Sequence, residues 1–174
     1  MLSQPLLTPR LQLIPVTPPL VRAAQNGPAA FARVIGADAP EDWCRGSLAL
    51  VANTLAFSGE QAFAATRAVA VHRDEGAVVG DVRFEACPHP LGEMEIGYSV
   101  APSRRRQGYA VEATGAILDW LFAESEVETI VAGCHRANVA SVRTLRRLGF
   151  WLDSTPASTF WWVLTKPLRS ATRA

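Results

Sequence analysis

The sequence predicts a single-domain, mixed α/β fold in which a central sheet carries helices on its faces. The chain has 174 residues, and 49% of them are hydrophobic, so one core can bury about 70% of the surface of the unfolded chain. Two strand patterns flank a turn signal at residues 73–76, which predicts a hairpin. From residue 93 onward, strand patterns alternate with helical ones. One domain over residues 1–174 is therefore expected.

The individual elements follow from hydrophobic periodicity and from Pro and Gly punctuation. The first half is predicted to hold a strand at 10–16, helices at 19–26, 28–35 and 46–66, and the hairpin strands at 67–72 and 77–85. The second half is predicted to hold strands at 93–100, 129–134, 150–152 and 160–164, with helices at 109–124 and 138–148. The apolar stripes of these two helices are Ala110, Ala113, Ile117, Trp120 and Leu121, and Val139, Val142, Leu145 and Leu148.

Composition excludes several classes of protein. Lys and Arg number 17 against 16 Asp and Glu, whereas a protein that coats a polyanion is normally strongly basic. No apolar stretch approaches the ~20 residues that span a membrane, and the N-terminus lacks a hydrophobic signal region. The three His are scattered, so no metal site is predicted, and the cysteines favour a reducing compartment: Cys44, Cys87 and Cys134. A cytoplasmic protein without membrane or nucleic-acid partners is expected.

A basic turn that contains glycine joins the strand at 93–100 to the helix at 109–124. The first N–H groups of a helix have no internal partner and the macrodipole is positive there, so such a turn can bind an anion. Gly108 would let the backbone approach a phosphate, and three consecutive arginines, 104–106, add charge. A solvated turn is the alternative. The Walker A ending and the GxGxxG fingerprint are both missing from the sequence.

The strand and turn have the sequence EIGYSVAPSRRRQGYAVEA, and the helix at 138–148 begins the sequence NVASVRTLRRLGF. In this order, with a helix and a strand between them, they resemble the acetyl-CoA-dependent N-acetyltransferases of the GNAT superfamily. Within it they resemble the branch of the ribosomal-protein N-terminal acetyltransferases, whose opening strand is similar to TPRL at 8–11. The resemblance implies a mostly antiparallel sheet flanked by helices, with a splayed strand pair that binds acyl-CoA.

The resemblance also implies which residues hold the cofactor. The family pattern (Arg/Gln)-x-x-Gly-x-(Gly/Ala) is met by residues 105–110, whose backbone N–H groups would bind the pyrophosphate of coenzyme A. These residues are Arg105, Arg106, Gln107, Gly108, Tyr109 and Ala110. Many relatives carry glycine where Arg106 stands. Free backbone groups around Ser99 and Val100, at the splay, would bind the pantetheine arm.

Asn138 and Ser141 have two interpretations. From residue type alone, Asn138 is a favoured helix N-cap, with Ser141 in the first turn. The resemblance instead assigns the pair to the Asn-x-x-Ser motif of the family, where the Asn helps to hold the pantetheine end and the hydroxyl lies near the thioester sulfur. The two roles are compatible because a capping Asn still presents its amide.

Acetyl transfer to an amine is aminolysis of a thioester and needs a neutral amine. An α-amino group has a pKa of about 7.7–8.0, so part of it is neutral near pH 7, whereas a lysine amine at about 10.4 needs more help. By its match to the Glu-Ile-Gly-Tyr strand of the family, Glu95 is the first candidate for the base, directly or through water, with Glu93 in reserve. An exposed strand carboxylate is the alternative for both. Ser141 is the candidate acid, the N–H near Val100 could stabilise the oxyanion, and Glu112 is interpreted as structural.

Three functions stay open. The first is an acetyl-CoA-dependent N-acetyltransferase whose acceptor is a protein N-terminal α-amine or a small amine. The second is a catalytically silent acyl-CoA-binding or sensor module on the same fold. The third, which is less favoured, is nucleic-acid binding by the last helix through Arg143, Arg146 and Arg147. A homodimer is also left open. Three tryptophans of the final hairpin are expected in the core or at a dimer surface rather than against an acceptor: Trp151, Trp161 and Trp162.

Overall fold

The computed structural model describes residues 2–53, 66–86 and 94–167, and the chain divides into two compact units. The first unit comprises Met1–Phe84 and Gly97–Ile117, and the second comprises Glu85–Ile96 and Leu118–Ala174. The chain passes from one unit to the other inside strand β5 (Met94–Val100) and inside helix α6 (Tyr109–Glu124).

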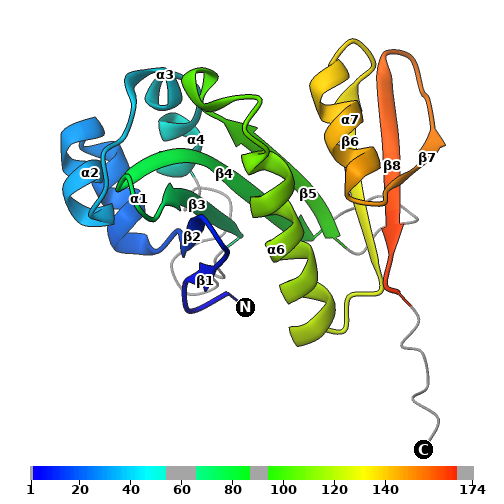
Figure 1. Cartoon of the computed structure of the whole chain (residues 1–174), viewed down its shortest axis with the longest axis horizontal. Coiled ribbons are helices and arrows are strands. Elements are labelled where there is room, and N and C mark those ends of the chain that lie inside the picture. Colours follow the sequence, from blue (N-terminus) through cyan, green and yellow to red (C-terminus); the bar gives the residue numbers. More distant parts are fainter. Residues whose placement is uncertain (1, 54–65, 87–93, 168–174) are drawn as a thin grey trace, which may run out of the picture. The chain divides into compact units, whose positions relative to one another are not determined.

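The first unit is built on antiparallel strands. Strand β1 (Leu6–Leu7) pairs with β2 (Leu11–Pro15), β2 with β3 (Arg67–His72), and β3 with β4 (Ala77–Ala86), as Figure 1 shows. Strand β2 confirms the strand predicted at 10–16, and its side chains alternate in burial: Leu11 and Leu13 are fully buried while Gln12 between them is not. The hairpin predicted around residues 73–76 is confirmed as well.

Helices pack against this sheet and form a hydrophobic core with it. They are α1 (Pro18–Gln25), α2 (Pro28–Ile35), α3 (Glu41–Trp43), the π-helical segment η1 (Cys44–Leu48) and α4 (Ala49–Ala52). The first two match the predicted helices at 19–26 and 28–35, and each has a Pro in its first turn, where no N–H partner is lost. The helix predicted over 46–66 starts earlier, at Glu41. Its residues 54–65 lie outside the described residues, and Thr66, the last residue of the prediction, is not helical.

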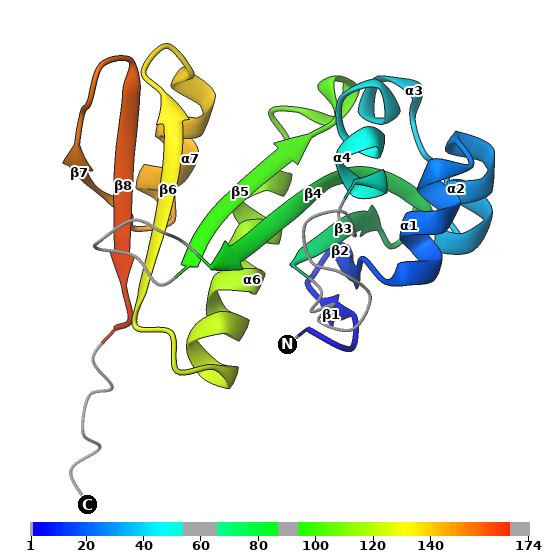
Figure 2. The same cartoon turned by 180° about the vertical axis from the view of Figure 1, so that it is seen from behind.

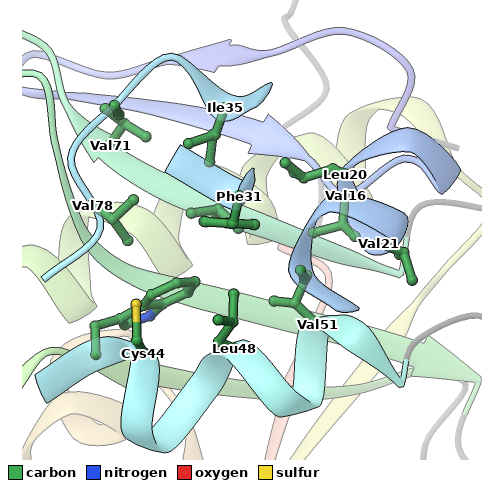
Figure 3. Packing of buried hydrophobic residues seen from close by; sticks show 14 of the residues in the cluster. Val16, Leu20, Val21, Phe31, Ile35, Cys44, Leu48, Val51, Val71 and Val78 are labelled. Carbon is green, nitrogen blue, oxygen red and sulfur yellow. The ribbon is translucent and has the colours of Figure 1, made fainter. Parts of the chain in front are cut away.

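Apolar side chains from these helices pack onto the strands. Figure 3 shows Phe31, Leu48 and Val51 facing Val71 and Val78 of the sheet. Each fully buried side chain of this size stabilises the fold by about 1.5–3 kcal/mol relative to exposure. The core therefore fixes α3 and η1 against β3 and β4, which matters for the polar residues that these elements carry.

Helix α6 begins and ends where the sequence predicts, at residues 109 and 124. It follows a short 3-10 helix, η2 (Pro102–Arg104), and the basic turn. Of its predicted stripe, Ala113, Ile117 and Leu121 are buried, whereas Ala110 and Trp120 are only partly buried.

The second unit contains the C-terminal strands, helix α7 and the last part of α6 (Figure 2). The N-terminal end of β5 runs parallel to β6 (Thr129–His135), and β6 is antiparallel to β8 (Thr159–Thr165), which pairs with β7 (Trp151–Ser154). Helix α7 (Val139–Arg147) confirms the predicted helix at 138–148, but Val139 of its predicted apolar face is 53% exposed, because it occupies the first position after the cap.

The strand order is β1-β2-β3-β4-β5-β6-β8-β7. Antiparallel neighbours predominate and helices flank the strands, so the predicted mixed, mostly antiparallel fold is confirmed. None of the helices in the described part of the chain is long and apolar enough to cross a membrane.

Candidate active site

The basic turn, defined as residues 102–108, ends in a left-handed glycine directly before α6. Gly108 has φ +83°, a left-handed conformation that glycine adopts without cost. The side chains or backbones of Arg105, Arg106, Gln107 and Gly108 are exposed, whereas Tyr109 is buried. The turn therefore presents backbone and two guanidinium groups to solvent at the start of α6.

Arg106 is also left-handed, with φ +65°. A residue with a Cβ has a cost of about 1–2 kcal/mol in this region. This is the position at which the resemblance leads one to expect glycine. The substitution has therefore kept the local backbone conformation of a glycine and added strain and a positive charge.

Two polar contacts fix the first part of the turn. The N–H of Ser103 donates to Asp42 Oδ2 at 2.7 Å, and this hydrogen bond holds the pKa of Asp42 below its ordinary value. Arg104 forms an ion pair with Glu75 (Nη1 to Oε2, 2.5 Å). Of the three consecutive arginines, one is thus engaged by the β3–β4 hairpin, and Arg105 donates from Nε to the carbonyl of Val100 at 3.3 Å.

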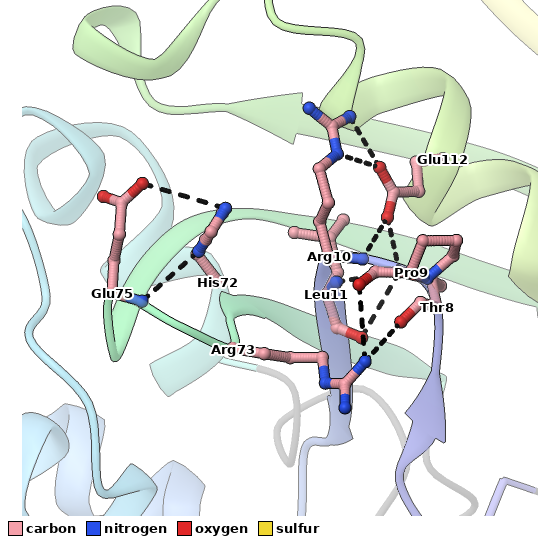
Figure 4. A network of polar contacts seen from close by, with 8 residues as sticks. All are labelled: Thr8, Pro9, Arg10, Leu11, His72, Arg73, Glu75 and Glu112. Carbon is pink, nitrogen blue, oxygen red and sulfur yellow. Dashed lines mark hydrogen bonds and ion pairs between the residues drawn. The ribbon is translucent and has the colours of Figure 1, made fainter.

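The end of the turn is fixed by Glu112, in the first turn of α6. Its carboxylate accepts hydrogen bonds from the hydroxyl of Thr8 at 2.6 Å and the backbone N–H of Arg10 at 2.9 Å, and it forms an ion pair with the Arg10 guanidinium at 2.6 Å (Figure 4). Burial would raise the pKa of Glu112, but these hydrogen bonds and the charge of Arg10 outweigh burial and lower the pKa. The interpretation of Glu112 as structural is confirmed.

Arg10 and Arg73 extend this network. The Arg10 guanidinium lies 4.6 Å from the ring centroid of Tyr109, a cation–π contact, and the ring of His72 meets Tyr109 edge-on at 5.8 Å. Arg73 donates to the carbonyl of Thr8 at 3.0 Å (Figure 4). The TPRL segment at 8–11 thus ties the start of β2 to the start of α6.

Strand β5 leads into the turn. Its predicted cofactor residues, Ser99 and Val100, lie in the first unit together with the turn. The Ser99 hydroxyl donates to Asp81 and lies 2.9 Å from the hydroxyl of Ser47. Asp81 also forms a buried ion pair with Arg67. The sequence analysis missed this cluster, although the charged residues inside the apolar strand patterns at 67–72 and 77–85 are a signal that could have pointed to it.

The remaining predicted residues lie in the second unit. Glu95 is partly exposed and stands in register with Val131, in a β5–β6 pairing that covers only Met94 and Glu95 of β5. Asn138 caps α7, because its side-chain oxygen accepts from the N–H of Ser141 at 3.1 Å, so the cap interpretation is confirmed. Glu93, the reserve base, lies outside the described residues.

The predicted tryptophans, cysteines and metal site complete the comparison with the sequence. Arg146 of α7 packs over the ring of Trp162, which is 2% exposed, whereas Trp151 is 50% exposed. Cys44 and Cys134 are free thiols, and burial raises the pKa of Cys44, while Cys87 lies outside the described residues. Within the described ranges, no three His, Cys, Asp or Glu side chains are grouped so that they could hold a metal ion.

The chain is similar to known acetyltransferases in sequence. The family model of the acetyltransferase (GNAT) domain matches residues 10–151. The uncharacterized N-acetyltransferase YjdG of Bacillus subtilis (strain 168) is 35% identical over 95 residues, which are 55% of this chain and 56% of YjdG. The uncharacterized N-acetyltransferase YnaD of the same organism is 35% identical over 97 residues, 52% of this chain and 55% of YnaD. The chain spans about half the length of these curated relatives.

Solved structures share the fold. An acetyltransferase (GNAT family) from Bacillus anthracis has a TM-score of 0.65 at 17% identity and covers 94% of this chain and 99% of its own. A ribosomal-protein-S5-alanine acetyltransferase from Vibrio fischeri has a TM-score of 0.60 at 18% identity, with 94% and 97% covered. At these identities the likeness concerns the fold alone. Because the family model matches well over half of the chain, this protein belongs to the GNAT family of acetyltransferases.

Proposed function

We propose that the chain transfers the acetyl group of acetyl-CoA to a primary amine. The observation that carries the proposal is the geometry of the basic turn, where exposed backbone, a left-handed Gly108 and two exposed arginines meet at the start of α6. This combination fits a diphosphate, since helix N-termini and arginine forks are both suited to phosphate oxygens. The anchoring of the turn by Asp42, Glu75 and Glu112 supports the proposal, because the N–H groups are held in place before the ligand arrives.

The turn residues 105–110 would hold the pyrophosphate of acetyl-CoA through backbone N–H groups. The backbone of Val100, which follows Ser99, would pair with the pantetheine arm as an added strand, whereas the Ser99 carbonyl oxygen lies against Gly80 of β4. Support comes from the chain order, since β5 ends at Val100, two residues before the turn that would hold the pyrophosphate. Asn138 would bind the pantetheine end with its amide. When bound, acetyl-CoA supplies the thioester that is the acetyl donor.

The catalytic roles are also proposed. Glu95 would accept the proton of the attacking amine, directly or through a water molecule. The backbone N–H near Val100 would donate to the oxygen that gains negative charge. Ser141, whose hydroxyl is partly exposed beside the Asn138 cap, would donate a proton to the leaving thiolate.

The acceptor is proposed to be a protein N-terminal α-amine or a small amine. An α-amine has the lower pKa of the two common protein amines and so needs less help from a base near neutral pH. The fold shared with a ribosomal-protein-S5-alanine acetyltransferase is compatible with this class. We expect the protein to act in the cytoplasm.

Binding and transfer can be tested separately. Calorimetry with acetyl-CoA measures the Kd, and mass spectrometry detects acetylated products in a panel of N-terminal peptides and small amines. Gly108→Val should weaken acetyl-CoA binding at least tenfold, because a β-branched residue cannot adopt φ +83° without moving the turn. The matched control is Gly27→Val, a glycine at φ +96° that lies at the start of α2. An equal Kd in wild type and Gly108→Val would contradict the phosphate assignment.

The base is tested by Glu95→Gln. General-base catalysis contributes about 10²–10⁴-fold, so kcat should fall by at least tenfold while the Kd of acetyl-CoA stays within twofold. Glu126→Gln, at an exposed position, is the control. Unchanged turnover in Glu95→Gln would exclude Glu95 as the base, and binding without transfer to any amine in wild type would favour a silent acyl-CoA-binding module.

A further inference from the structure

A buried polar cluster lies between β4 and β5, centred on Asp81. The Asp81 side chain is 3% exposed and forms an ion pair with Arg67, whose side chain is 9% exposed. Its Oδ1 atom accepts from the indole Nε1 of Trp43 at 3.3 Å and from the Ser99 hydroxyl at 2.5 Å. A buried carboxylate with this many donors is fully paired, so the cluster holds its members in one arrangement.

Trp43 and Ser47 belong to the helical layer that packs on the strands, and both contribute side chains to the cluster. Trp43 ends α3, and Ser47 belongs to η1, the π-helical segment that follows it. Both side chains are buried, at 1% and 4% exposure. A π-helical turn is rare and often occurs at functional sites. Here the π-helical turn places the Ser47 hydroxyl in the cluster, directly after the residue whose indole N–H joins it.

The direction of the hydrogen bonds follows from chemistry. An ionised carboxylate only accepts, so the single proton of the Ser99 hydroxyl is donated to Asp81. The Ser47 hydroxyl, 2.9 Å away, must then donate to Ser99. A serine oxygen has two acceptor positions, and Ser47 occupies one. The Ser99 oxygen is therefore left as an acceptor for one further N–H or O–H group.

The residue that carries this position is not enclosed in the core. Ser99 is partly exposed, unlike Asp81 and Ser47. In a strand the side chain stands out of the sheet, whereas the backbone N–H and C=O groups lie in its plane. In the proposed function the pantetheine arm uses the in-plane groups of Val100, because the carbonyl oxygen of Ser99 lies against Gly80 of β4. An amine that approached the bound arm from the face of the sheet on which the Ser99 side chain stands would meet this hydroxyl.

We propose that Ser99 accepts a hydrogen bond from the acceptor amine and that Asp81 is the positioning residue that orients the Ser99 hydroxyl. An amine held by one N–H keeps its lone pair free for the thioester carbon. The attack itself, the proton transfer and the departure of the thiolate stay as in the proposed function, on which this inference rests.

The test separates an effect on the amine from an effect on the cofactor or the fold. The kcat and KM for an amine that wild type acetylates, and the Kd for acetyl-CoA, are measured in Ser99→Ala, Ser99→Thr and the control Ser125→Ala. Ser125 also has a partly buried hydroxyl, bonded to the carbonyl of Leu121 in α6. Ser99→Ala should lower kcat/KM for the amine about 10- to 100-fold, the loss expected of a misplaced nucleophile, with the acetyl-CoA Kd within twofold. Ser99→Thr should retain at least a third of the wild-type value.

Two results would overturn the inference. One is a Ser99→Ala variant with kcat/KM within twofold of wild type. The other is a parallel loss of turnover and acetyl-CoA affinity, which would assign the hydroxyl to the cofactor. If the Asp81→Asn variant folds, it should lose as much kcat/KM as Ser99→Ala does. If Asp81→Asn does not fold, the result for Ser99→Ala decides the inference. A wild-type protein that binds acetyl-CoA but acetylates no amine overturns the proposed function itself, and this is seen before any variant is compared.

Discussion

Two carboxylates organise the first unit, and they differ in burial and in the segments that they join. Glu112 accepts hydrogen bonds from Thr8 and Arg10, which lie two residues apart, and its side chain is 14% exposed. Asp81 receives donors from three separate segments, at Trp43, Arg67 and Ser99, and its side chain is 3% exposed. The first anchors the start of α6 beside the basic turn, and the second fixes a hydroxyl on β5.

Both carboxylates accept from an arginine and a hydroxyl, but burial gives the two sets of contacts different roles. At Glu112 water can partly replace a lost hydrogen-bond partner. Loss of one contact there should move the turn but lower the free energy of unfolding only moderately. At Asp81 water has little access, so loss of a partner leaves a buried charge uncompensated. The deeper cluster should therefore dominate stability, and the shallower one should dominate pH dependence and binding.

The largest effect is expected from Arg67→Met, which leaves Asp81 buried without its ion-pair partner. Breaking a buried pair on one side costs about 3–5 kcal/mol, so the free energy of unfolding in urea should fall by that amount. The control is Arg45→Met, since Arg45 and Glu41 form an exposed pair and such pairs contribute about 0–1 kcal/mol. Equal losses in the two variants would remove the distinction between buried and exposed pairs in this protein.

Glu112→Gln should have the next largest effect. Hydrogen bonds to a charged group contribute about 1.5–3 kcal/mol, and the variant keeps the shape of the side chain while removing the charge that faces Arg10. We expect a loss of that size at pH 7, together with weaker acetyl-CoA binding because the turn is less firmly held. Thermal and urea unfolding at pH 7 measure the first effect and calorimetry measures the second.

The pH dependence of stability gives an independent check on Glu112. Its pKa is lowered in the folded protein, so its contribution is complete above the unfolded value of about 4.3 and is lost as the pH falls through the folded pKa. Below about pH 4.3, the wild-type free energy of unfolding should therefore fall more steeply with acid than that of Glu112→Gln. Parallel curves would show that Glu112 titrates alike in the folded and unfolded states.

Gly80→Ala tests how closely β4 and β5 approach beside Asp81. A Cβ on Gly80 would lie 2.2 Å from the carbonyl oxygen of Ser99, so the strands must move apart. Overpacking of this kind costs about 1–3 kcal/mol. Gly46→Ala is the contrasting control, because a Cβ there meets nothing within 4 Å and the residue is helical, which favours Ala by up to about 1 kcal/mol. The two glycine variants should shift the unfolding midpoint in opposite directions.

Local features of the molecule could be predicted from the sequence because their partners lie close in the chain. The cap at Asn138 involves a residue three positions away. The left-handed conformation at residue 108 is indicated by the glycine itself. The boundaries of α6 follow from a long apolar period and the turn before it. Here sequence pattern and structure agree because one backbone segment contains both partners.

Charged residues inside apolar strand patterns could have pointed to Arg67 and Asp81, but not to their pairing or to their other partners. Those depend on the register of β3 and β4, which shifts between Ala70 and Val71, and on the π-helical turn of η1. No periodicity in the sequence specifies either feature. The TPRL segment was matched to the family, but its contact with Glu112, about one hundred residues away, depends on tertiary structure. The site was therefore predictable where it is local and not where it is assembled from distant strands.

The smallest effect concerns Arg106, the left-handed residue in the turn that Glu112 anchors. Arg106→Gly removes the cost of a Cβ at φ +65°, about 1–2 kcal/mol, but it also gives the unfolded chain more freedom. A net gain of up to about 1 kcal/mol is expected, visible as a higher midpoint of thermal unfolding. Ala157→Gly, at φ +50° in the turn before β8, is the matched control for strain relief without loss of charge.

Comparison of these two variants separates strain from charge. Both should gain stability, but only Arg106→Gly should weaken acetyl-CoA binding, by about threefold to tenfold, with a smaller dependence of the Kd on salt, because one cation beside the phosphates is removed. If Arg106→Gly binds acetyl-CoA as tightly as wild type at low salt, the charge contributes nothing to the cofactor. The turn would then act through its backbone alone, and its anchoring by Glu112 would be the main determinant of affinity.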